Sequence, residues 1–160
     1  LAFAFPNSQI TASDINVSAL EVAKINVEKH SLEKRINLVK SDIFSAMQKS
    51  KFDLIIANPP YVQDFLVDEF PKEYKHEPRV AFLGGANGID IIKSILKTAC
   101  NHLTEDGLLF MEVGSAKEAI EYSLPDIGFT WISADSGEQS VFMVESHNLA
   151  VSKDALILDQ

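Results

Sequence analysis

Apolar and polar positions along the chain predict strands that alternate with helices. Short apolar runs predict strands at 9–13, 36–39, 52–57, 108–113, 129–134 and 140–145. Asn16 is expected to cap a first helix, one face of which carries Val17, Leu20, Lys24 and Val27. A second helix is predicted to end at the Asp106-Gly107 turn, from the stripe Ile89, Ile92, Leu96, Ala99 and Leu103. A third helix is predicted over 116–124, whereas the tail after His147 is weakly specified.

This alternation predicts an α/β fold with a mostly parallel sheet and helices on both faces. The run Phe52–Ala57 is apolar except for Asp53, which favours a strand buried on both faces. No helix separates the last two strands, and residues 135–138 between them carry a hairpin signal. We therefore expect one antiparallel edge strand.

Composition narrows the class of protein. The chain has 160 residues, a size typical of one domain, and a formal net charge of −9. That charge disfavours direct nucleic-acid binding, which normally rests on basic side chains. Cys100 is the only cysteine, so neither an intrachain disulfide nor a cysteine metal cluster can form. No apolar run approaches the roughly 18 residues of a membrane span, and no signal-peptide pattern is present. We expect a cytoplasmic protein that is not bound to a membrane.

Polar residues that directly follow strands point to a site. Ligands of such sheets bind outside the carboxyl ends of the strands. The segments at these ends are Asp14, Asp42, Asn58–Tyr61 and Glu112–Gly114. The segment from Tyr61 to Gly88 is also much longer than a usual connection, and long loops are often functional. We expect the four strand ends to converge on one edge.

Asn58-Pro59-Pro60-Tyr61 is the most informative motif. Two prolines remove two N–H donors and fix two φ angles, which leaves a stiff loop with free carbonyl acceptors. Asn58 adds a side-chain acceptor and Tyr61 adds a flat apolar face. Such a loop suits a planar –NH2 group, although the same residues would also serve as a rigid strand-to-loop corner.

Residues 53–61 closely resemble the motif of S-adenosylmethionine-dependent enzymes that methylate amino groups. The stretches Glu73–Pro78, Gly84–Gly88 and Glu112–Gly114 are similar to the HemK-type protein glutamine methyltransferases. Within that family, His76-Glu77-Pro78 and Phe129-Thr130-Trp131 resemble the PrmB branch, which acts on the third protein of the large ribosomal subunit. The resemblance covers about residues 1–145 and implies a Rossmann-like methyltransferase sheet.

The resemblance also implies roles for individual residues. S-adenosyl-L-methionine is the expected cofactor, with Asp14 on the ribose hydroxyls and Asp42 on the adenine amine. The full set expected at the cofactor is Asp14, Ile15, Asp42, Ile43 and Asn58. The catalytic residues are expected to be Asn58, Pro59 and Tyr61. Asn58, Pro60, Tyr61 and Glu77 are expected to bind the substrate, and no metal is expected.

The chain departs from the family before Asp14. The family binds the methionine end of its cofactor with a Gly-rich loop after a first strand, and the 13 residues before Asp14 hold no such loop. Residues 1–5 resemble the end of the helix that follows this strand. We therefore expect a C-terminal fragment, with a partial catalytic domain over 1–147 and a tail over 148–160.

Four functions stay open on the sequence. The first is methylation of a glutamine side chain in the ribosomal protein, and the second is the same reaction on a peptide chain release factor. The strand Phe129-Thr130-Trp131 and the ending Ser140–Met143 favour the first. The third is adenine methylation in DNA by base flipping, which the charge of −9 disfavours. The fourth is a non-catalytic remnant without cofactor.

Overall fold

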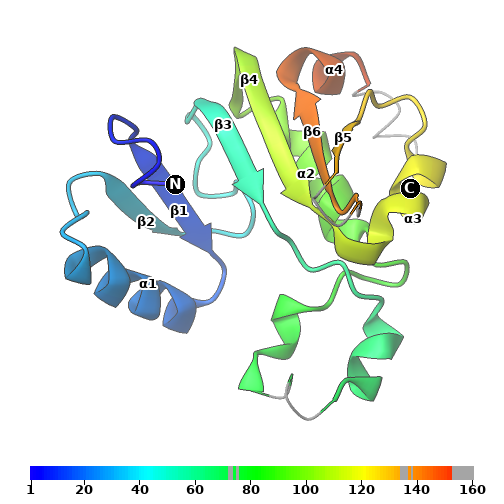
Figure 1. Ribbon diagram of the computed structural model, residues 1–160, viewed down its shortest axis with the longest axis horizontal. Coiled ribbons are helices and arrows are strands. Elements are labelled where there is room, and N and C mark those ends of the chain that lie inside the picture. The colour runs from blue at the N-terminus through cyan, green and yellow to red at the C-terminus, as the bar shows by residue number, and fades with distance from the viewer. Residues whose placement is uncertain (72–73, 75, 134–136, 138, 153–160) are drawn as a thin grey trace. The chain divides into compact units, whose positions relative to one another are not determined.

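The computed structural model describes residues 1–160 except 72–73, 75, 134–136, 138 and 153–160. The chain divides into two compact units, residues 1–50 and residues 51–160. The first holds a two-stranded sheet, β1-β2, and the second a four-stranded sheet in the order β3-β4-β6-β5 (Figure 1). No helix among the described residues is long and apolar enough to cross a membrane.

The first unit is one βαβ motif. Strand β1 (Ile10–Asp14) pairs in parallel with β2 (Ile36–Lys40), and helix α1 (Val17–Lys29) connects them. The predicted cap is confirmed, because Asn16 Oδ1 accepts the Ser18 N–H at 2.9 Å. Both strands lie within a residue or two of their predicted limits.

Arg35 fastens residues 1–8 to the start of β2. Its guanidinium donates to the carbonyls of Ala2 (2.9 Å), Phe5 (2.6 Å) and Ser8 (3.2 Å). A planar guanidinium offers five donors in a fixed geometry, so one side chain satisfies three carbonyls. The turns at the amino end of the chain are thereby held against the sheet of the first unit.

The predicted apolar face of α1 is only partly correct. No residue of α1 is buried, and Val17 and Lys24 of the predicted stripe are exposed. The half-buried positions include Leu20 and Val27, as expected, together with Ala23. A helix over two strands has little sheet to cover, so few of its side chains lose contact with water.

The second unit carries the larger sheet. Strand β3 (Phe52–Ala57) pairs in parallel with β4 (Leu103–Glu112), and β4 pairs antiparallel with β6 (Val141–Glu145). The short strand β5 (Thr130–Ile132) pairs antiparallel with β6 and forms the outer edge. The predicted parallel pairing and the hairpin are confirmed. The antiparallel strand is β6, one place in from the edge.

One face of this sheet forms the core. Leu109 pairs with Val144 and Met111 with Phe142, and all four side chains are fully buried. Phe142 also contacts Phe129 and Trp131 edge-on, with ring centroids 4.8 and 5.4 Å apart. Helix α2 (Asp90–Ala99) adds the buried stripe Ile92, Ile95, Leu96 and Ala99.

The boundary between α2 and β4 differs from the prediction. The helix ends at Ala99, and Leu103 already belongs to β4, where it pairs with Phe52. The next pair is Leu54 with Leu108, so Asp106 and Gly107 lie in an irregularity of the strand and form no turn after a helix. Pairing with β3 extends β4 past an Asp-Gly sequence that locally favours a turn.

Strand β3 is not buried on both faces. Leu54 is 38% exposed and Ile56 is 52% exposed, whereas Ile55 and Ala57 on the other face are half-buried. Within the described residues β3 pairs only with β4, and β1 only with β2. The described strands therefore form two sheets, β1-β2 and β3-β4-β6-β5.

The remaining elements are short. Among its described residues, the segment after Tyr61 contains the 3-10 helices η1 (Asp64–Glu69) and η3 (Arg79–Ala81) and no long helix. After β4 come the 3-10 turn η4 (Gly114–Ala116) and helix α3 (Lys117–Ser123). Helix α4 (Ser146–Val151) was not predicted and crosses the boundary expected at 147. The expected tail beyond 152, and residues 134–136 and 138 of the hairpin, lie outside the described residues.

Candidate functional site

The motif Asn58–Tyr61 lies where β3 ends, next to the end of β4. Ala57 is the last residue of β3 and pairs with Met111, so Asn58 and Glu112 leave the sheet at the same edge. Asn58 is exposed, Pro59 is buried, and Pro60 and Tyr61 are half-buried. The buried proline anchors the loop, while the Asn58 side chain is free to meet a ligand from solution.

The chain after Tyr61 is tied to the segment that returns to α2. The Val62 N–H donates to Phe82 O (3.1 Å), and the Gly84 N–H donates back to Val62 O (2.8 Å). Asp64 makes two further hydrogen bonds between these segments, since its N–H donates to Gly85 O and its Oδ1 accepts the Gly85 N–H at 2.9 Å. These bonds fix the base of the long connection directly beside Tyr61.

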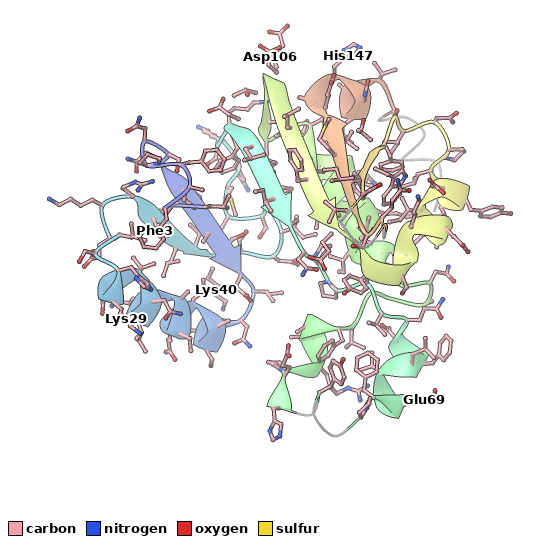
Figure 2. The ribbon with its side chains drawn as sticks, viewed as in Figure 1. Phe3, Lys29, Lys40, Glu69, Asp106 and His147 are labelled. Atoms are coloured by element: carbon pink, nitrogen blue, oxygen red, sulfur yellow. The ribbon has the colours of Figure 1, made fainter. Side chains whose placement is uncertain are left out.

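The rest of the connection projects from the carboxyl end of β3. Figure 2 shows Glu69 at the far end of this projection, and Asp106 and His147 at the opposite end of the same unit. The rings of Phe70, Tyr74 and Phe82 contact one another with centroids 5.0–5.9 Å apart and form its small core.

An ion pair also joins η1 to η3. Arg79 Nη1 donates to Asp68 Oδ1, and this bond, with the Arg79 charge, lowers the pKa of the Asp68 carboxyl below its ordinary value. Glu77 is exposed on this projection, and its N–H donates to Tyr74 O at 3.2 Å. Its role on the substrate side stays a prediction, and Glu73 and Lys75 of the same motif lie outside the described residues.

In the first unit, Asp14 ends β1 and is exposed. Its Oδ1 accepts the Asn16 N–H at 2.7 Å, which shapes the turn into α1, while Asn16 itself caps the helix. Asp14 therefore does not itself cap the helix. A carboxylate accepts several hydrogen bonds, so Asp14 keeps capacity for the hydroxyls of a ligand. Ile15, the next residue, is 51% exposed.

Asp42 follows β2, the neighbouring strand, and it too is exposed. Residues 43–46 form turns, so Asp42 caps no helix. Its N–H donates to Ser45 Oγ at 3.2 Å, which leaves the carboxylate as an acceptor for N–H or O–H groups. Asp14 pairs with Lys40, so the chain leaves β1 at Asp14 and β2 at Ser41 on the same edge.

Ile43 has φ of +48°, a conformation that β-branched residues rarely adopt. The buried Ser41 holds this turn in place, because its Oγ donates to Ile43 O (2.9 Å) and accepts the Ala46 N–H (3.1 Å). The Ser41 N–H also donates to Asp14 O at 3.1 Å. Ser41 thus connects the two acidic strand ends.

The predicted site residues fall into two clusters. Asp14, Ile15, Asp42 and Ile43 lie at one edge of the β1-β2 sheet, where two exposed carboxylates and apolar side chains fit a ligand with hydroxyl and amino donors. Asn58–Tyr61 lie at the end of β3 beside Glu112–Gly114. The strand ends therefore lie side by side in pairs within each unit, and the convergence of all four on one edge stays a prediction. In the described part of the chain, no group of three or more His, Cys, Asp and Glu side chains is placed to hold a metal ion.

Sequence reasoning missed Ser41 and the part played by the glycines around Tyr61. Ser41 carries a weak signal, since a serine directly before an acidic strand end is common in turns. Three of the seven glycines, Gly84, Gly88 and Gly114, approach Tyr61, although they lie 23 to 53 positions further along the chain. No pattern among neighbouring residues in the sequence indicates such contacts.

Known proteins with similar sequences are methyltransferases. Residues 1–70 match the family described as "Methyltransferase small domain". The ribosomal protein uL3 glutamine methyltransferase of Francisella tularensis is 41% identical over 151 residues, which cover 94% of this chain and 48% of that protein. The protein of the same name from Bradyrhizobium diazoefficiens is 38% identical over 92% of this chain and 46% of its own length.

Solved structures show the same fold at low sequence identity. A methyltransferase of Pyrococcus furiosus matches 91% of this chain and 66% of its own chain, with TM-score 0.65 and 18% identity. A ribosomal RNA methyltransferase of T. thermophilus, solved with AdoMet and guanosine, matches 86% of this chain and 31% of its own, with TM-score 0.55 and 17% identity. The Rossmann-like methyltransferase fold is confirmed by these structures. Over 94% of its length, the chain is thus similar in sequence to a ribosomal protein uL3 glutamine methyltransferase, and it spans about half the length of the curated relatives it matches.

Proposed function

We propose that the protein carrying this chain transfers a methyl group from S-adenosyl-L-methionine to a glutamine side chain of ribosomal protein uL3. The observation that supports this most is the stiff acceptor loop Asn58–Tyr61 at the exposed end of β3. The names of the relatives support the choice of substrate.

Asn58 and Pro59 would bind the substrate amide through hydrogen bonds. The Asn58 Oδ1 and the Pro59 carbonyl accept the two N–H bonds of the glutamine –NH2, and the Tyr61 ring packs on the amide plane. An amide nitrogen is a poor nucleophile because its lone pair is delocalised into the carbonyl. Two acceptors on its hydrogens push electron density onto nitrogen and fix its direction of attack.

Asp14 and Asp42 would hold the cofactor in the first unit. The Asp14 carboxylate accepts from the ribose hydroxyls, and the Asp42 carboxylate accepts from the adenine amine, both as charge-assisted bonds. Ile15 and Ile43 provide apolar contacts beside the adenine ring. When bound, the cofactor supplies a methyl group on a positively charged sulfur, which keeps the electron pair of the broken C–S bond.

Positioning accounts for the rate in this proposal. A nitrogen held in line with the methyl group can gain up to about 7–11 kcal/mol in the best oriented systems. The methylated nitrogen is far more acidic than the amide, so its proton passes to water and no side-chain base is needed. His76 therefore has no assigned role.

The substrate would meet the enzyme in the cytoplasm, where bacterial ribosomal proteins are made. The same chemistry suits a glutamine in a peptide chain release factor, and the acceptor loop alone does not separate the two substrates. The names of the relatives favour uL3. Incubation of the full-length protein with each of the two substrates separates these possibilities.

The variant Asn58→Ala tests the acceptor loop in the full-length protein. Loss of one acceptor to the reacting nitrogen should lower methyl transfer by about a hundredfold or more, since small losses of positioning have effects of this size. Cofactor affinity should change little, because Asp14 and Asp42 keep the main polar contacts. Methyl transfer is measured with radiolabelled cofactor and affinity by calorimetry.

Asn26→Ala is the matched control, because Asn26 is exposed on α1 and belongs to neither strand-end cluster. It should leave both quantities unchanged. Turnover at the wild-type rate in Asn58→Ala would contradict the proposed mechanism.

A further inference from the structure

Three glycines surround Tyr61, and a side chain on any of them would strike it. A Cβ on Gly84 would lie 2.9 Å from the Tyr61 Cα and carbonyl carbon, and a Cβ on Gly88 would lie 2.5 Å from the Tyr61 carbonyl oxygen. Real Cβ atoms do not approach other heavy atoms this closely. The backbone of Tyr61 therefore lies in a space that exists only because two residues have no side chain.

The third glycine faces the ring. Gly114 follows β4 by two residues and has φ of +49°, a conformation that favours glycine. A Cβ on Gly114 would lie 2.4 Å from Tyr61 Cε2, 2.6 Å from Cζ and 3.0 Å from Cδ2. One side of the ring thus packs directly on the backbone that leaves β4.

Burial and a hydrogen bond fix the position of the end of β4. Met111 and Val113 are fully buried, and the Val113 N–H donates to Ser140 O at 2.8 Å beside β6. Asn58 leaves β3 next to Glu112, so the same two strands carry the acceptor loop and the backbone under the ring. A shift of the ring would change its position relative to Asn58, which lies three residues earlier.

We propose that Gly114 is a positioning residue that sets where the Tyr61 ring lies, with Gly84 and Gly88 fixing the backbone of Tyr61. This inference rests on the proposed function, because the ring so placed is the one that packs on the substrate amide. Gly114 acts through Tyr61 and does not itself contact the reacting atoms.

Gly137 provides a matched control for backbone strain. It also has a positive φ, of +82°, but in the described part of the chain a Cβ there would have no heavy atom within 4 Å beyond Gly137 and its two chain neighbours. Gly137→Ala therefore introduces strain without a collision. Gly114→Asn separates the two effects in the opposite way, since asparagine tolerates positive φ but still carries a Cβ.

The first measurement reports the ring itself. Fluorotyrosine is incorporated into the full-length protein, and the fluorine NMR signal of Tyr61 is identified as the one that Tyr61→Phe removes. We expect Gly114→Ala and Gly114→Asn to shift this signal and Gly137→Ala to leave it in place. An unmoved Tyr61 signal in Gly114→Ala overturns the proposal.

The second measurement separates positioning from binding. In Gly114→Ala and Gly114→Asn, kcat for glutamine methylation should fall by about a hundredfold, the cost of roughly an ångström of misplacement. The KM for S-adenosylmethionine should stay near its wild-type value. Wild-type kcat in Gly114→Asn would mean that backbone strain alone matters, and it would overturn the proposal.

A double variant keeps the test decisive if Gly114→Ala unfolds. Tyr61→Ala removes the ring that the new methyl group would strike, so Tyr61→Ala combined with Gly114→Ala should recover most of the stability that Gly114→Ala alone loses. Independent, additive losses would overturn the proposal. If the wild-type protein methylated no glutamine, the proposed function would fail, and the Tyr61 signal would still decide whether Gly114 places the ring.

Discussion

At the scale of single residues, Ser41 organises the first unit. Its N–H donates to Asp14 O, and its Oγ donates to Ile43 O and accepts from the Ala46 N–H. Ile43 at positive φ costs about 1–3 kcal/mol, which the surrounding bonds must offset. A buried serine thus keeps a strained residue and two acidic strand ends in one arrangement.

Ser41→Ala should therefore weaken both stability and cofactor binding. Loss of the Oγ leaves a carbonyl and an N–H without their partner, at a cost of about 1–3 kcal/mol in the free energy of unfolding. Urea unfolding of the full-length protein measures this cost, and calorimetry measures the affinity for S-adenosylmethionine. Ser13→Ala, at an exposed position of β1, is the control. Equal effects of the two substitutions would show that the Ser41 contacts contribute no more to stability or cofactor binding than those of an exposed serine.

The conformation and contacts of a residue were predictable from the sequence where they depend only on its neighbours in the chain. The prolines of Asn58–Tyr61 restrict φ wherever they occur, and the Asn16 cap depends on neighbours two residues away. Positive φ at Ile43 and the contact of Gly114 with Tyr61 depend on bonds and packing between distant segments. Such features appear only when the chain is folded.

At the scale of elements, the pairing of strands that are distant in sequence explains why a predicted element boundary was wrong. Asp106-Gly107 favours a turn by itself, but Phe52 and Leu54 pair on either side of it and draw it into β4. Strand β3 matched its predicted limits, because Phe52 and the run Leu54–Ile56 are apolar residues typical of a buried strand. Helix α4 was missed because its burial rests on Ser146 and Leu149, too few positions to show a helical period.

The Asp68–Arg79 pair makes the stability of the projection depend on pH. The hydrogen bond from Arg79 and its charge lower the pKa of Asp68, so the pair stabilises the projection fully above the ordinary Asp pKa of about 3.9. This contribution is lost as the pH falls through the lowered pKa. Because both side chains are exposed, we expect a small effect confined to residues 64–82.

Hydrogen exchange of residues 64–82 between pH 5 and pH 2 measures this dependence, after correction for intrinsic exchange rates. Asp68→Asn should remove the extra loss of protection at low pH, whereas Asp106→Asn, on the opposite end of the unit, should not (Figure 2). A wild-type pH profile in Asp68→Asn would assign the dependence to other groups.

At the scale of the whole molecule, the two units differ in how much core they hold. In the first unit, the buried apolar side chains among described residues are Ala2 and Met47, whereas the second unit contains a continuous buried layer on β4 and β6. Large apolar side chains are exposed on the first unit, including Val22 and Ile25 of α1. Assays of function therefore belong in the full-length protein, since relatives are about twice as long as this chain.

The central claim is tested most directly by mass spectrometry of the product. The full-length protein is incubated with S-adenosylmethionine that carries a deuterated methyl group and, in separate reactions, with unmodified uL3, a peptide chain release factor and a DNA duplex. We predict a labelled methyl group on a glutamine side chain of uL3, in the wild-type protein and not in Asn58→Ala. Label on the release factor alone or on adenine, or no label on any substrate, would contradict the account.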